Sequence, residues 1–567
     1  MKLLSSSLPV SIVMILVMEF TSTDVLAGQI SQTSEASNAN SRQVISPDGI
    51  HGTLVLVGGG AVPESVRELL FRNTAKTNDS ESRSSSIVVL GMAADNPSAA
   101  ADRAVVWLLE SSANTDQKSD ITGYSTVDEE LIQAIDKADA VWICGGQQSR
   151  LAKSIEGSGV EEALHRLLDR NGTIAGTSAG AAIMSRVMIA SGKDQPQISK
   201  GMDLLPGAIV DQHFTQRNRL GRSKLAVAAN PHCFGLGIDE DTAVIVSGRQ
   251  MKIIGRGAAT CLLAKCDYRD EEVVRLQAPA IADLTQWRRA AACRTRNADP
   301  GLPRLGPPQV KEGALVIVGG GSMPPDIVNR FIELAGGKDA KIVVLPTAVP
   351  RDVARRQRIP GFLANSSASS VRILPQVWPE EIASEEFQLS LKEATGVWFG
   401  GGRQWHFVDA YENTNAISLF TDVLKRGGVI GGSSAGATIQ GEFLVRGHPI
   451  GNTVMMAEGY ERGFGFLPAV AIDQHFVQRG RMPDLIPVIR KHPELLGIGI
   501  DEGTALVVQG TKAEVIGQHS AHFLTSEAIR QIDASGVSET PAQSYYRTVE
   551  TGGAIDFGEL IPSDAKN

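Results

Sequence analysis

Two serines, Ser178 and Ser434, each lie in the pattern G-x-S-x-G, within "GTSAG" and "GSSAG". A short apolar run precedes each serine and a helical pattern follows it, which is the strand–turn–helix context of a nucleophile elbow. Such a turn exposes the serine Oγ at a helix N-terminus, where developing negative charge is stabilised. The same pattern also suits a tight glycine turn whose serine caps a helix. These serines are therefore candidate nucleophiles, and two structural turns are the alternative.

A histidine follows each serine at a matched place, His213 and His475, inside the tetrapeptide "DQHF". A serine nucleophile needs such a base to take its proton, and the base needs a carboxylate that orients it. The motif "GIDE" supplies a glutamate 27 residues after each histidine. The candidate acids are Glu240 and Glu502, and the preceding aspartates, Asp239 and Asp501, compete for the same role. Adjacent residues at a strand entry point to opposite faces, so only one acid of each pair is expected to reach the imidazole.

The elements that position these residues occur twice, because the chain contains two copies of one domain. Five blocks recur in the same order, at offsets of 261, 256, 256, 262 and 262 residues. A period this long indicates tandem domains rather than a solenoid. We predict a first domain over 50–265, a linker over 266–311, a second domain over 312–525 and a polar tail over 526–567. One helix is expected within the linker, over 280–292, just after Pro279.

Short apolar runs alternate with longer amphipathic stretches in each domain. The expected strands of the first domain are 54–57, 87–90, 141–143 and 243–246, and residues 161–170 have helical spacing. This alternation predicts an α/β fold, with a mostly parallel, flavodoxin-like sheet and helices on both faces. Ligands of such sheets bind at the carboxyl ends of the strands, where glycine motifs occur here at Gly58, Gly145 and Gly176. The backbone N–H groups of Ala179 and of the glycine loop 58–60 are candidate donors to an oxyanion, with loop 319–321 as the second domain's equivalent.

The N-terminus has the pattern of an export signal over 1–27, with a lysine, an apolar core and a small-residue end. Residues 28–49 are polar and predict a flexible linker. We therefore expect a secreted or periplasmic protein with no integral membrane domain after removal of the signal. A retained N-terminal anchor is the alternative.

The bulk composition excludes several classes of partner. The chain has 567 residues, of which 42% are hydrophobic and 21% charged, and its formal net charge is −9. No basic face is indicated, so nucleic acid is not an expected partner. There is no H-E-x-x-H motif, and the "VGGG" stretches lack the residues that complete a phosphate loop. We expect no cofactor and no metal.

Three motifs of the first domain resemble those of cyanophycinase and its relatives, a serine exopeptidase family that also includes aspartyl dipeptidases. The motifs are "GTSAGAAIM", "DQHFTQRNRLGR" and "LGIDEDTAVIV". The resemblance covers nearly all of the first domain and, more loosely, the second. It implies a class I glutamine-amidotransferase-like fold and a Ser-His-Glu arrangement in each domain. The implied catalytic residues are Ser178, His213 and Glu240, and Ser434, His475 and Glu502.

The resemblance also implies substrate contacts around the same motifs. In the first domain these are Gln148, Asp211, Gln212, Arg217, Arg219 and Arg222. In the second domain they are Gln404, Asp473, Gln474, Arg479 and Arg481. The family substrate, cyanophycin, is a polyaspartate with arginine on each side chain, and arginines bind carboxylates through paired hydrogen bonds. Weak surface ion pairs are the alternative role of these arginines.

The second domain departs from this pattern at two places, Asp484 in place of a third arginine and Arg403 in place of Gln147. Its pocket is therefore expected to differ while its catalytic residues persist. We expect an exported serine peptidase that acts on cyanophycin or related β-aspartyl peptides and releases dipeptides such as β-Asp-Arg. The alternatives are an aspartyl or isoaspartyl dipeptidase, and an acidic-peptide-binding protein with one or both sites inactive. The two domains are also candidates to pack as a pseudo-dimer.

Overall fold

A computed structural model describes residues 45–72, 85–112, 119–296, 307–535 and 542–560 of the chain. The predicted signal peptide, and the polar linker up to residue 44, lie outside the described residues. No helix in the described ranges combines the length and the apolar character needed to cross a membrane. Below, "first domain" denotes residues 45–296 and "second domain" residues 307–560.

The first domain contains a large sheet in which strands from its N-terminal half are all parallel. In spatial order the strands are β14 (Ala280–Asp283), β11 (Gln250–Gly255), β10 (Thr242–Gly248), β1 (Ile50–Val57), β5 (Thr173–Thr177), β4 (Ala140–Ile143), β2 (Ser85–Leu90) and β3 (Ser119–Tyr124). The β1–β5–β4–β2–β3 half is parallel, and β10, β11 and β14 extend it in antiparallel fashion. A second sheet has the order β13 (Glu272–Gln277), β12 (Ala258–Leu263), β9 (Phe234–Ile238) and β8 (Ala208–Gln212). A hairpin is formed by β6 (Val187–Ser191) and β7 (Gln197–Lys200).

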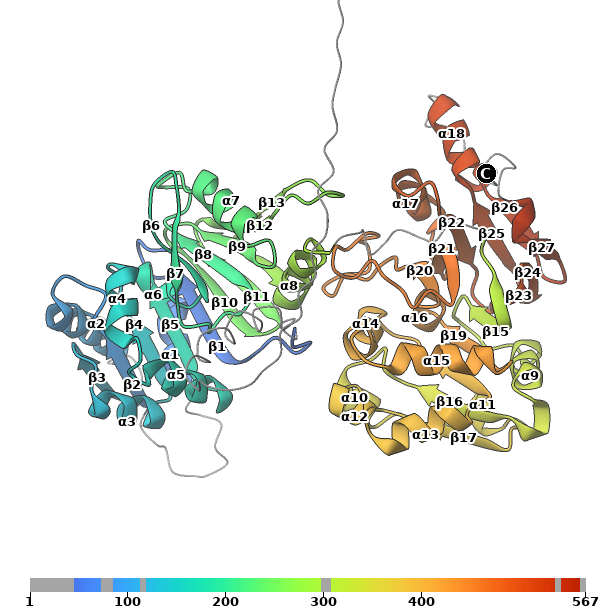
Figure 1. The fold of residues 1–567 in the computed structure, drawn as a ribbon, viewed down its shortest axis with the longest axis horizontal. Helices are drawn as coiled ribbons and strands as arrows, with labels where there is room; N and C mark the ends of the chain where they lie inside the picture. The colour runs from blue at the N-terminus through green and yellow to red at the C-terminus, as the bar shows by residue number, and fades with distance from the viewer. Residues whose placement is uncertain (1–44, 73–84, 113–118, 297–306, 536–541, 561–567) are drawn as a thin grey trace, which may run out of the picture. The chain divides into compact units, whose positions relative to one another are not determined.

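Helices cover both faces of the large sheet, as Figure 1 shows. The helices are α1 (Glu64–Arg72), α2 (Pro97–Ser112), α3 (Glu129–Lys137), α4 (Gln148–Ile155), α5 (Val160–Asp169), α6 (Ala179–Ala182), α7 (Leu220–Ala229) and α8 (Leu284–Cys293). Apolar side chains of α3 and α5, such as Ile135 and Leu164, belong to one core cluster. Those of α1 and α2, such as Leu70 and Leu108, belong to another cluster. Because the sheet is buried on both faces, the expected α/β class with helices on both sides is confirmed.

The second domain repeats the strand order of the large sheet, and its other sheet has one more strand, because β20 joins it where β6 forms a hairpin with β7 in the first domain. Its large sheet has the order β17 (Ser370–Ile373), β16 (Lys341–Leu345), β18 (Gly396–Phe399), β19 (Val429–Ser433), β15 (Val310–Val318), β23 (Thr504–Gly510), β24 (Lys512–Gly517) and β27 (Ala554–Asp556). The other sheet has the order β20 (Gly441–Phe443), β21 (Leu467–Gln474), β22 (Leu496–Ile500), β25 (Ser520–Leu524) and β26 (Arg547–Glu550). The α-helices are α9 (Pro325–Leu334), α10 (Arg351–Ala354), α11 (Gly361–Ala364), α12 (Pro379–Ile382), α13 (Glu385–Glu393), α14 (Trp405–Tyr411), α15 (Ala416–Lys425), α16 (Ala435–Thr438), α17 (Leu485–Lys491) and α18 (Ser526–Ser535). Short 3₁₀ turns are η2 (Gly337–Asp339), η3 (Met482–Asp484), η4 (Ala542–Tyr545) and η5 (Phe557–Glu559).

The structural repeat is longer than the motif blocks indicate, and this corrects the predicted linker and tail. Strands β13 and β14 fall in the predicted linker 266–311, yet they pair with β12 and β11 of the first domain. Strands β26 and β27 fall in the predicted tail 526–567, yet they pair with β25 and β24 at the equivalent places. These strands lie at sheet edges and have partly exposed side chains, so their sequences carry no apolar run that would mark them.

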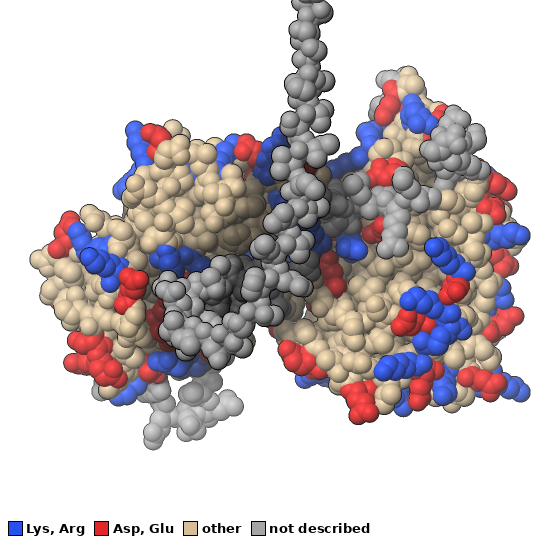
Figure 2. Space-filling model, viewed as in Figure 1, with Lys and Arg blue, Asp and Glu red and all other residues tan. Residues whose placement is uncertain are grey.

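The helix expected over 280–292 begins four residues later. Residues Ala280–Asp283 form strand β14, and helix α8 starts at Leu284. The Asp283 carboxylate caps it by accepting a hydrogen bond from the Gln286 amide at 2.8 Å. On the face seen in Figure 2, basic and acidic side chains are interspersed, in keeping with the small net charge of the chain.

Candidate active sites

The two G-x-S-x-G segments are strand-to-helix turns, after β5 in the first domain and after β19 in the second. Ser178 has φ 53° and ψ −110°, and Ser434 has φ 56° and ψ −114°. This region of backbone conformation costs a non-glycine residue about 1–3 kcal/mol and is typical of functional turns. Neither serine side chain caps its helix, so these turns do not match the alternative of a glycine turn with a helix-capping serine.

The framing glycines of the first turn are required by close backbone approach. A Cβ on Gly176 would lie 2.5 Å from the Gly180 carbonyl oxygen, and a Cβ on Gly180 would lie 2.3 Å from the carbonyl oxygen of Ile143. Both distances are far below van der Waals contact. The turn therefore packs against neighbouring strands in a way that only glycine allows.

Each serine is hydrogen-bonded to the histidine that the sequence pairs with it. The Ser178 Oγ lies 2.8 Å from His213 Nε2, and the Ser434 Oγ lies 2.9 Å from His475 Nε2. The histidines follow the last residues of β8 and β21, at φ 49° and 52°. Serine and histidine come from different sheets, and the sharp backbone turns at both residues bring their side chains together.

The acid that reaches each imidazole is the glutamate. The His213 Nδ1 lies 2.6 Å from Glu240 Oε1, and the His475 Nδ1 lies 2.5 Å from Glu502 Oε1. With the proton on Nδ1, Nε2 presents its lone pair to the serine hydroxyl. Each domain thus contains an uninterrupted Ser–His–Glu chain of hydrogen bonds.

The competing aspartates point elsewhere. Asp239 is buried and accepts hydrogen bonds from the Thr215 amide at 3.2 Å, the Thr215 hydroxyl at 2.7 Å and Arg275 Nη2 at 2.8 Å. Asp501 accepts from the Val477 amide at 3.0 Å and lies 3.2 Å from His522 Nε2. These aspartates hold in place the segment that follows each histidine, and so they support the site indirectly.

The glycine loop after β1 contacts the imidazole directly. The His213 amide donates to the Gly58 carbonyl at 2.7 Å, and a Cβ on Gly59 would lie 2.2 Å from His213 Cε1. The loop after β15 does the same, since a Cβ on Gly320 would lie 2.2 Å from His475 Cε1. Within the described ranges, the amides of Gly59 and Ala179 have no hydrogen-bond partner and are free to bind an oxyanion.

Burial sets the protonation of both histidines. Burial lowers the pKa of His213 below its usual value, the hydrogen bond to Glu240 opposes this shift, and the nearby Arg217 charge adds to it. The pKa of His475 is lowered by burial in the same way, with Glu502 opposing and Arg479 adding. Each imidazole is therefore neutral near pH 7 and able to accept the serine proton.

Several residues predicted to contact substrate take part in a buried ion network, and two of them, Arg219 and Arg222, also line a pocket. Asp211 accepts hydrogen bonds from Arg219 Nη1 at 2.9 Å, Arg222 Nε at 2.8 Å and the Ser223 hydroxyl at 2.8 Å. Arg219 also donates to the backbone carbonyl of Gln212 at 2.8 Å. This network fixes the wall of the pocket, and Arg217, which is exposed, is the arginine of this group that is free to meet a substrate.

The side chain of each predicted glutamine donates a hydrogen bond to the backbone of the segment that leads into the pocket. Gln148 Nε2 donates to the Ile189 carbonyl at 2.8 Å, and Gln404 Nε2 donates to the Val445 carbonyl at 2.9 Å. Both side chains are buried. They hold the strand that leads into the pocket loop, β6 in the first domain.

The first domain contains a pocket of about 520 Å³. Its lining residues are Gln148, Ala190, Ser191, Gly192, Lys193, Arg217, Arg219 and Arg222. The cationic lining favours an anionic substrate. Lys193 was not among the predicted contacts, because it lies outside the repeated motifs.

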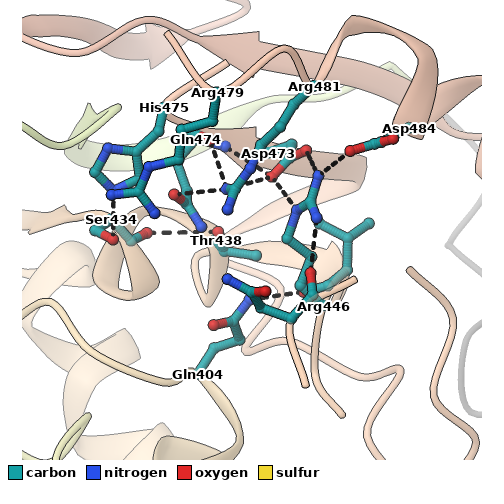
Figure 3. A network of polar contacts seen from close by, with 12 residues as sticks. Gln404, Ser434, Thr438, Arg446, Asp473, Gln474, His475, Arg479, Arg481 and Asp484 are labelled. Carbon is teal, nitrogen blue, oxygen red and sulfur yellow. Dashed lines mark hydrogen bonds and ion pairs between the residues drawn. The ribbon is translucent and has the colours of Figure 1, made fainter. Parts of the chain in front are cut away.

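The second domain contains a buried arginine that the motifs do not reveal, Arg446. Its Nε and Nη2 donate to the two carboxylate oxygens of Asp473, each at 2.9 Å, and Nη2 also donates to Asp484 (Figure 3). Arg481 Nη1 donates to the Gln474 carbonyl at 2.8 Å. Arg479 is half exposed and lies 3.8 Å from Glu502. A comparison of the loops after equivalent strands would have found Arg446, since Ala190 occupies its place in the first domain.

Comparisons with known proteins agree with this geometry. The family model of peptidase family S51 matches residues 107–254 and 315–516. A cyanophycinase of Geminocystis herdmanii is 29% identical over 227 residues, which are 39% of this chain and 84% of that protein. A cyanophycinase of Trichormus variabilis is 31% identical over 211 residues, which are 36% of this chain and 70% of that protein.

The chain was also matched to two solved structures whose names describe peptidases. One is a peptidase from an acI-B1 Actinobacterium, with 16% identity and a TM-score of 0.33 over 42% of this chain and 98% of that one. The other is a putative peptidase E protein from Listeria monocytogenes, with 16% identity and a TM-score of 0.27 over 36% of this chain and 99% of that one. On the family match, which covers more than half of the sequence, the chain belongs to peptidase family S51 and is a serine peptidase with two regions of that family.

Proposed function

We propose that this serine peptidase is an exopeptidase that hydrolyses cyanophycin or related β-aspartyl peptides and releases dipeptides such as β-Asp-Arg. The observation that carries the proposal is the Ser–His–Glu hydrogen-bond chain, present in both domains at 2.5–2.9 Å. The relatives named cyanophycinase support the choice of substrate.

The proposed reaction is acyl transfer through the serine. His213 takes the Ser178 proton as Oγ attacks the scissile amide carbonyl, and the free amides of Ala179 and Gly59 stabilise the oxyanion. The protonated imidazole then gives its proton to the leaving amine, which departs and leaves an acyl-serine ester. Water, deprotonated by the same imidazole, hydrolyses the ester and restores the hydroxyl. Glu240 holds the imidazole and stabilises its positive charge; Ser434, His475 and Glu502 have the same roles in the second domain.

The pocket of the first domain supports an acidic substrate. Lys193 and Arg217 are exposed on its wall, so each can bind a substrate carboxylate without breaking an internal ion pair. Asp211, Arg219 and Arg222 position this wall through their buried network. We therefore assign substrate binding in this domain to the exposed cations and a positioning role to the buried ones.

Two serine variants tested separately decide among the candidate functions. With Ser178→Ala and with Ser434→Ala, release of β-Asp-Arg from insoluble cyanophycin reports each remaining site. Cleavage of small β-aspartyl peptides without release from the polymer would favour a dipeptidase. If the wild type cleaves neither substrate and neither serine reacts with a serine-directed phosphonate, the protein is a binding protein and the enzyme proposal is wrong.

We also propose that the protein is secreted or periplasmic. The apolar run near the N-terminus, followed by small residues, supports this proposal. Fractionation of cells that produce the full chain tests it, together with N-terminal sequencing of the mature protein. Recovery of uncleaved protein from the cytoplasm alone would contradict it.

We further propose that the two domains pack as a pseudo-dimer. Ion pairs between them support this, including Arg249 Nη1 to Asp409 Oδ2 at 2.8 Å and Arg294 Nε to Glu458 Oε1 at 2.7 Å. All four side chains are at most 18% exposed. A protease site inserted within 297–306 allows the test: the halves should co-elute after cleavage, and separate elution would contradict the proposal.

A further inference from the structure

An equivalent buried aspartate is paired with an arginine from a different element in each domain. In the first domain Asp211 pairs with Arg222 of α7, whose Nε donates at 2.8 Å. In the second domain Asp473 pairs with Arg446, which follows β20 and donates from Nε and Nη2 at 2.9 Å. Both aspartate side chains are at most 2% exposed. The guanidinium is retained, but its origin in the chain has changed.

Two equivalent positions differ together between the domains. Ala190 and Arg446 are equivalent, because each follows a residue whose carbonyl accepts from the buried glutamine of its domain. Arg222 and Asp484 are equivalent, since each lies 11 residues after the buried aspartate. The first domain thus has alanine and arginine where the second has arginine and aspartate.

This exchange changes what a substrate meets. In the first domain the small Ala190 leaves space in a pocket that also presents Lys193. In the second domain the Arg446 side chain occupies the corresponding place, and its guanidinium is shared by two carboxylates. The Asp484 side chain is 38% exposed, on the side of Asp473 away from Ser434 (Figure 3).

The loop of the second domain has also lost its positive charge. Residues 447–452 read "GHPIGN" and contain no lysine, and Ile450 is 47% exposed. Arg403, the new cation nearby, donates to the His448 carbonyl at 2.6 Å and is held against the loop backbone. This loop therefore presents no unpaired cation, and the exposed carboxylate of Asp484 lies close to it. Arg479, the counterpart of Arg217, is half exposed but lies 3.8 Å from Glu502, which offsets its charge.

We propose that Arg446 and Asp484 determine the specificity of the second site: it accepts a basic substrate residue at the place where the first site accepts an acidic one. The proposal rests on the proposed peptidase function. Arg446 shapes and positions the wall, and the outer oxygen of Asp484 accepts a hydrogen bond from the substrate cation. One protein would then cleave peptides of opposite charge at two sites with the same chemistry.

Site-isolated enzymes test this proposal. In the Ser178→Ala background only the second site acts, and in the Ser434→Ala background only the first. The kcat/KM ratio for β-aspartyl peptides with lysine or with glutamate, placed on either side of the scissile bond, is measured for each. We expect a ratio of lysine to glutamate substrate at least tenfold higher at the second site. Equal ratios would overturn the proposal while leaving the peptidase function intact, whereas absence of all cleavage would overturn the function itself.

Variants that exchange these residues between the domains test whether the residues cause the difference in specificity, and they keep the buried aspartate paired. Ala190→Arg with Arg222→Asp in the first domain should raise its ratio about fivefold, and Asp484→Asn alone should lower that of the second about fivefold. Asp533→Asn is the matched control, because this exposed aspartate pairs with Arg490 on the same domain. A change below twofold in both exchange variants, with thermal unfolding unaltered, would overturn the assignment of these residues.

Discussion

The contact between the glycine loop and the catalytic imidazole leads to a sharp prediction for Gly59→Ala. The new Cβ would lie 2.2 Å from His213 Cε1, whereas ordinary contact begins at 3.4 Å. The loop backbone is held by the hydrogen bond from the Asp241 amide to the Gly59 carbonyl at 2.9 Å, so the imidazole is the group that moves. It must shift by about 1.2 Å, which breaks its 2.8 Å hydrogen bond to Ser178.

A misplacement of about 1 Å at a reacting group lowers rate by roughly 10²-fold. We therefore expect Gly59→Ala to reduce kcat by about 10²-fold in the Ser434→Ala background, where only the first site acts. The alanine is also placed at φ 105°, so the free energy of unfolding should fall by about 1–3 kcal/mol. Steady-state kinetics on a β-aspartyl peptide and urea denaturation measure the two effects separately.

Gly157→Ala is the matched control for backbone strain. Gly157 has φ 67°, and nothing lies within 4 Å of the place of its Cβ. This variant should lose stability to a similar degree and retain full kcat. If Gly59→Ala keeps kcat within twofold of its parent, or if Gly157→Ala loses as much activity, the steric argument is wrong.

Four further predictions concern the two sites. Because burial lowers the pKa of His213 and the neutral imidazole is the active form, the acid limb of the kcat/KM profile should have its midpoint below pH 6.5; a midpoint above that value would contradict the reasoning. Glu240→Gln removes the hydrogen bond that raises this pKa, so it should move the midpoint lower still and reduce kcat by about 10²–10⁴-fold. Asp239→Asn should instead reduce kcat less than about tenfold while costing about 1–3 kcal/mol of stability, and the reverse ranking of the two variants would make the aspartate the catalytic acid. Arg446→Ala leaves the buried Asp473 with Arg481 Nη1, at 3.4 Å, as its remaining cation and should lower the free energy of unfolding by about 1–3 kcal/mol; a loss below about 0.5 kcal/mol in urea denaturation would show that the pair with Arg446 does not stabilise the fold.

The geometry of the catalytic residues followed from sequence because strong local signals define it. G-x-S-x-G fixes a turn that only glycines permit, and repetition of "DQHF" and "GIDE" pairs each histidine with its acid. The choice between Glu240 and Asp239 needed the structure. It depends on which side chain turns toward the imidazole, and the two residues are neighbours in the chain.

The pocket was harder to predict because its residues contact one another across the fold. The burial of Arg222 and its pairing with Asp211 could not be predicted, since a surface arginine and a buried, paired one look alike in sequence. Arg446 lies outside any repeated block and 27 residues before its partner, so only a comparison of equivalent segments of the two domains would have found it. The edge strands β13 and β26 were missed for a related reason, because half-exposed strands lack an apolar run.

The exchanged arginines also constrain the history of the two domains. If the arginine 11 residues after the buried aspartate had been lost first, that carboxylate would have kept only the contact from the arginine eight residues after it, Arg219 or Arg481, at a cost of about 1–3 kcal/mol. Gain of the loop arginine first avoids this cost, because the paired hydrogen bonds to the carboxylate are then never lost. The less costly route from one arrangement to the other therefore passes through an intermediate with both arginines, in either direction. Asp484 also pairs with Arg446, so the substitution that alters the rim of the pocket is favoured once the one that altered its wall is in place.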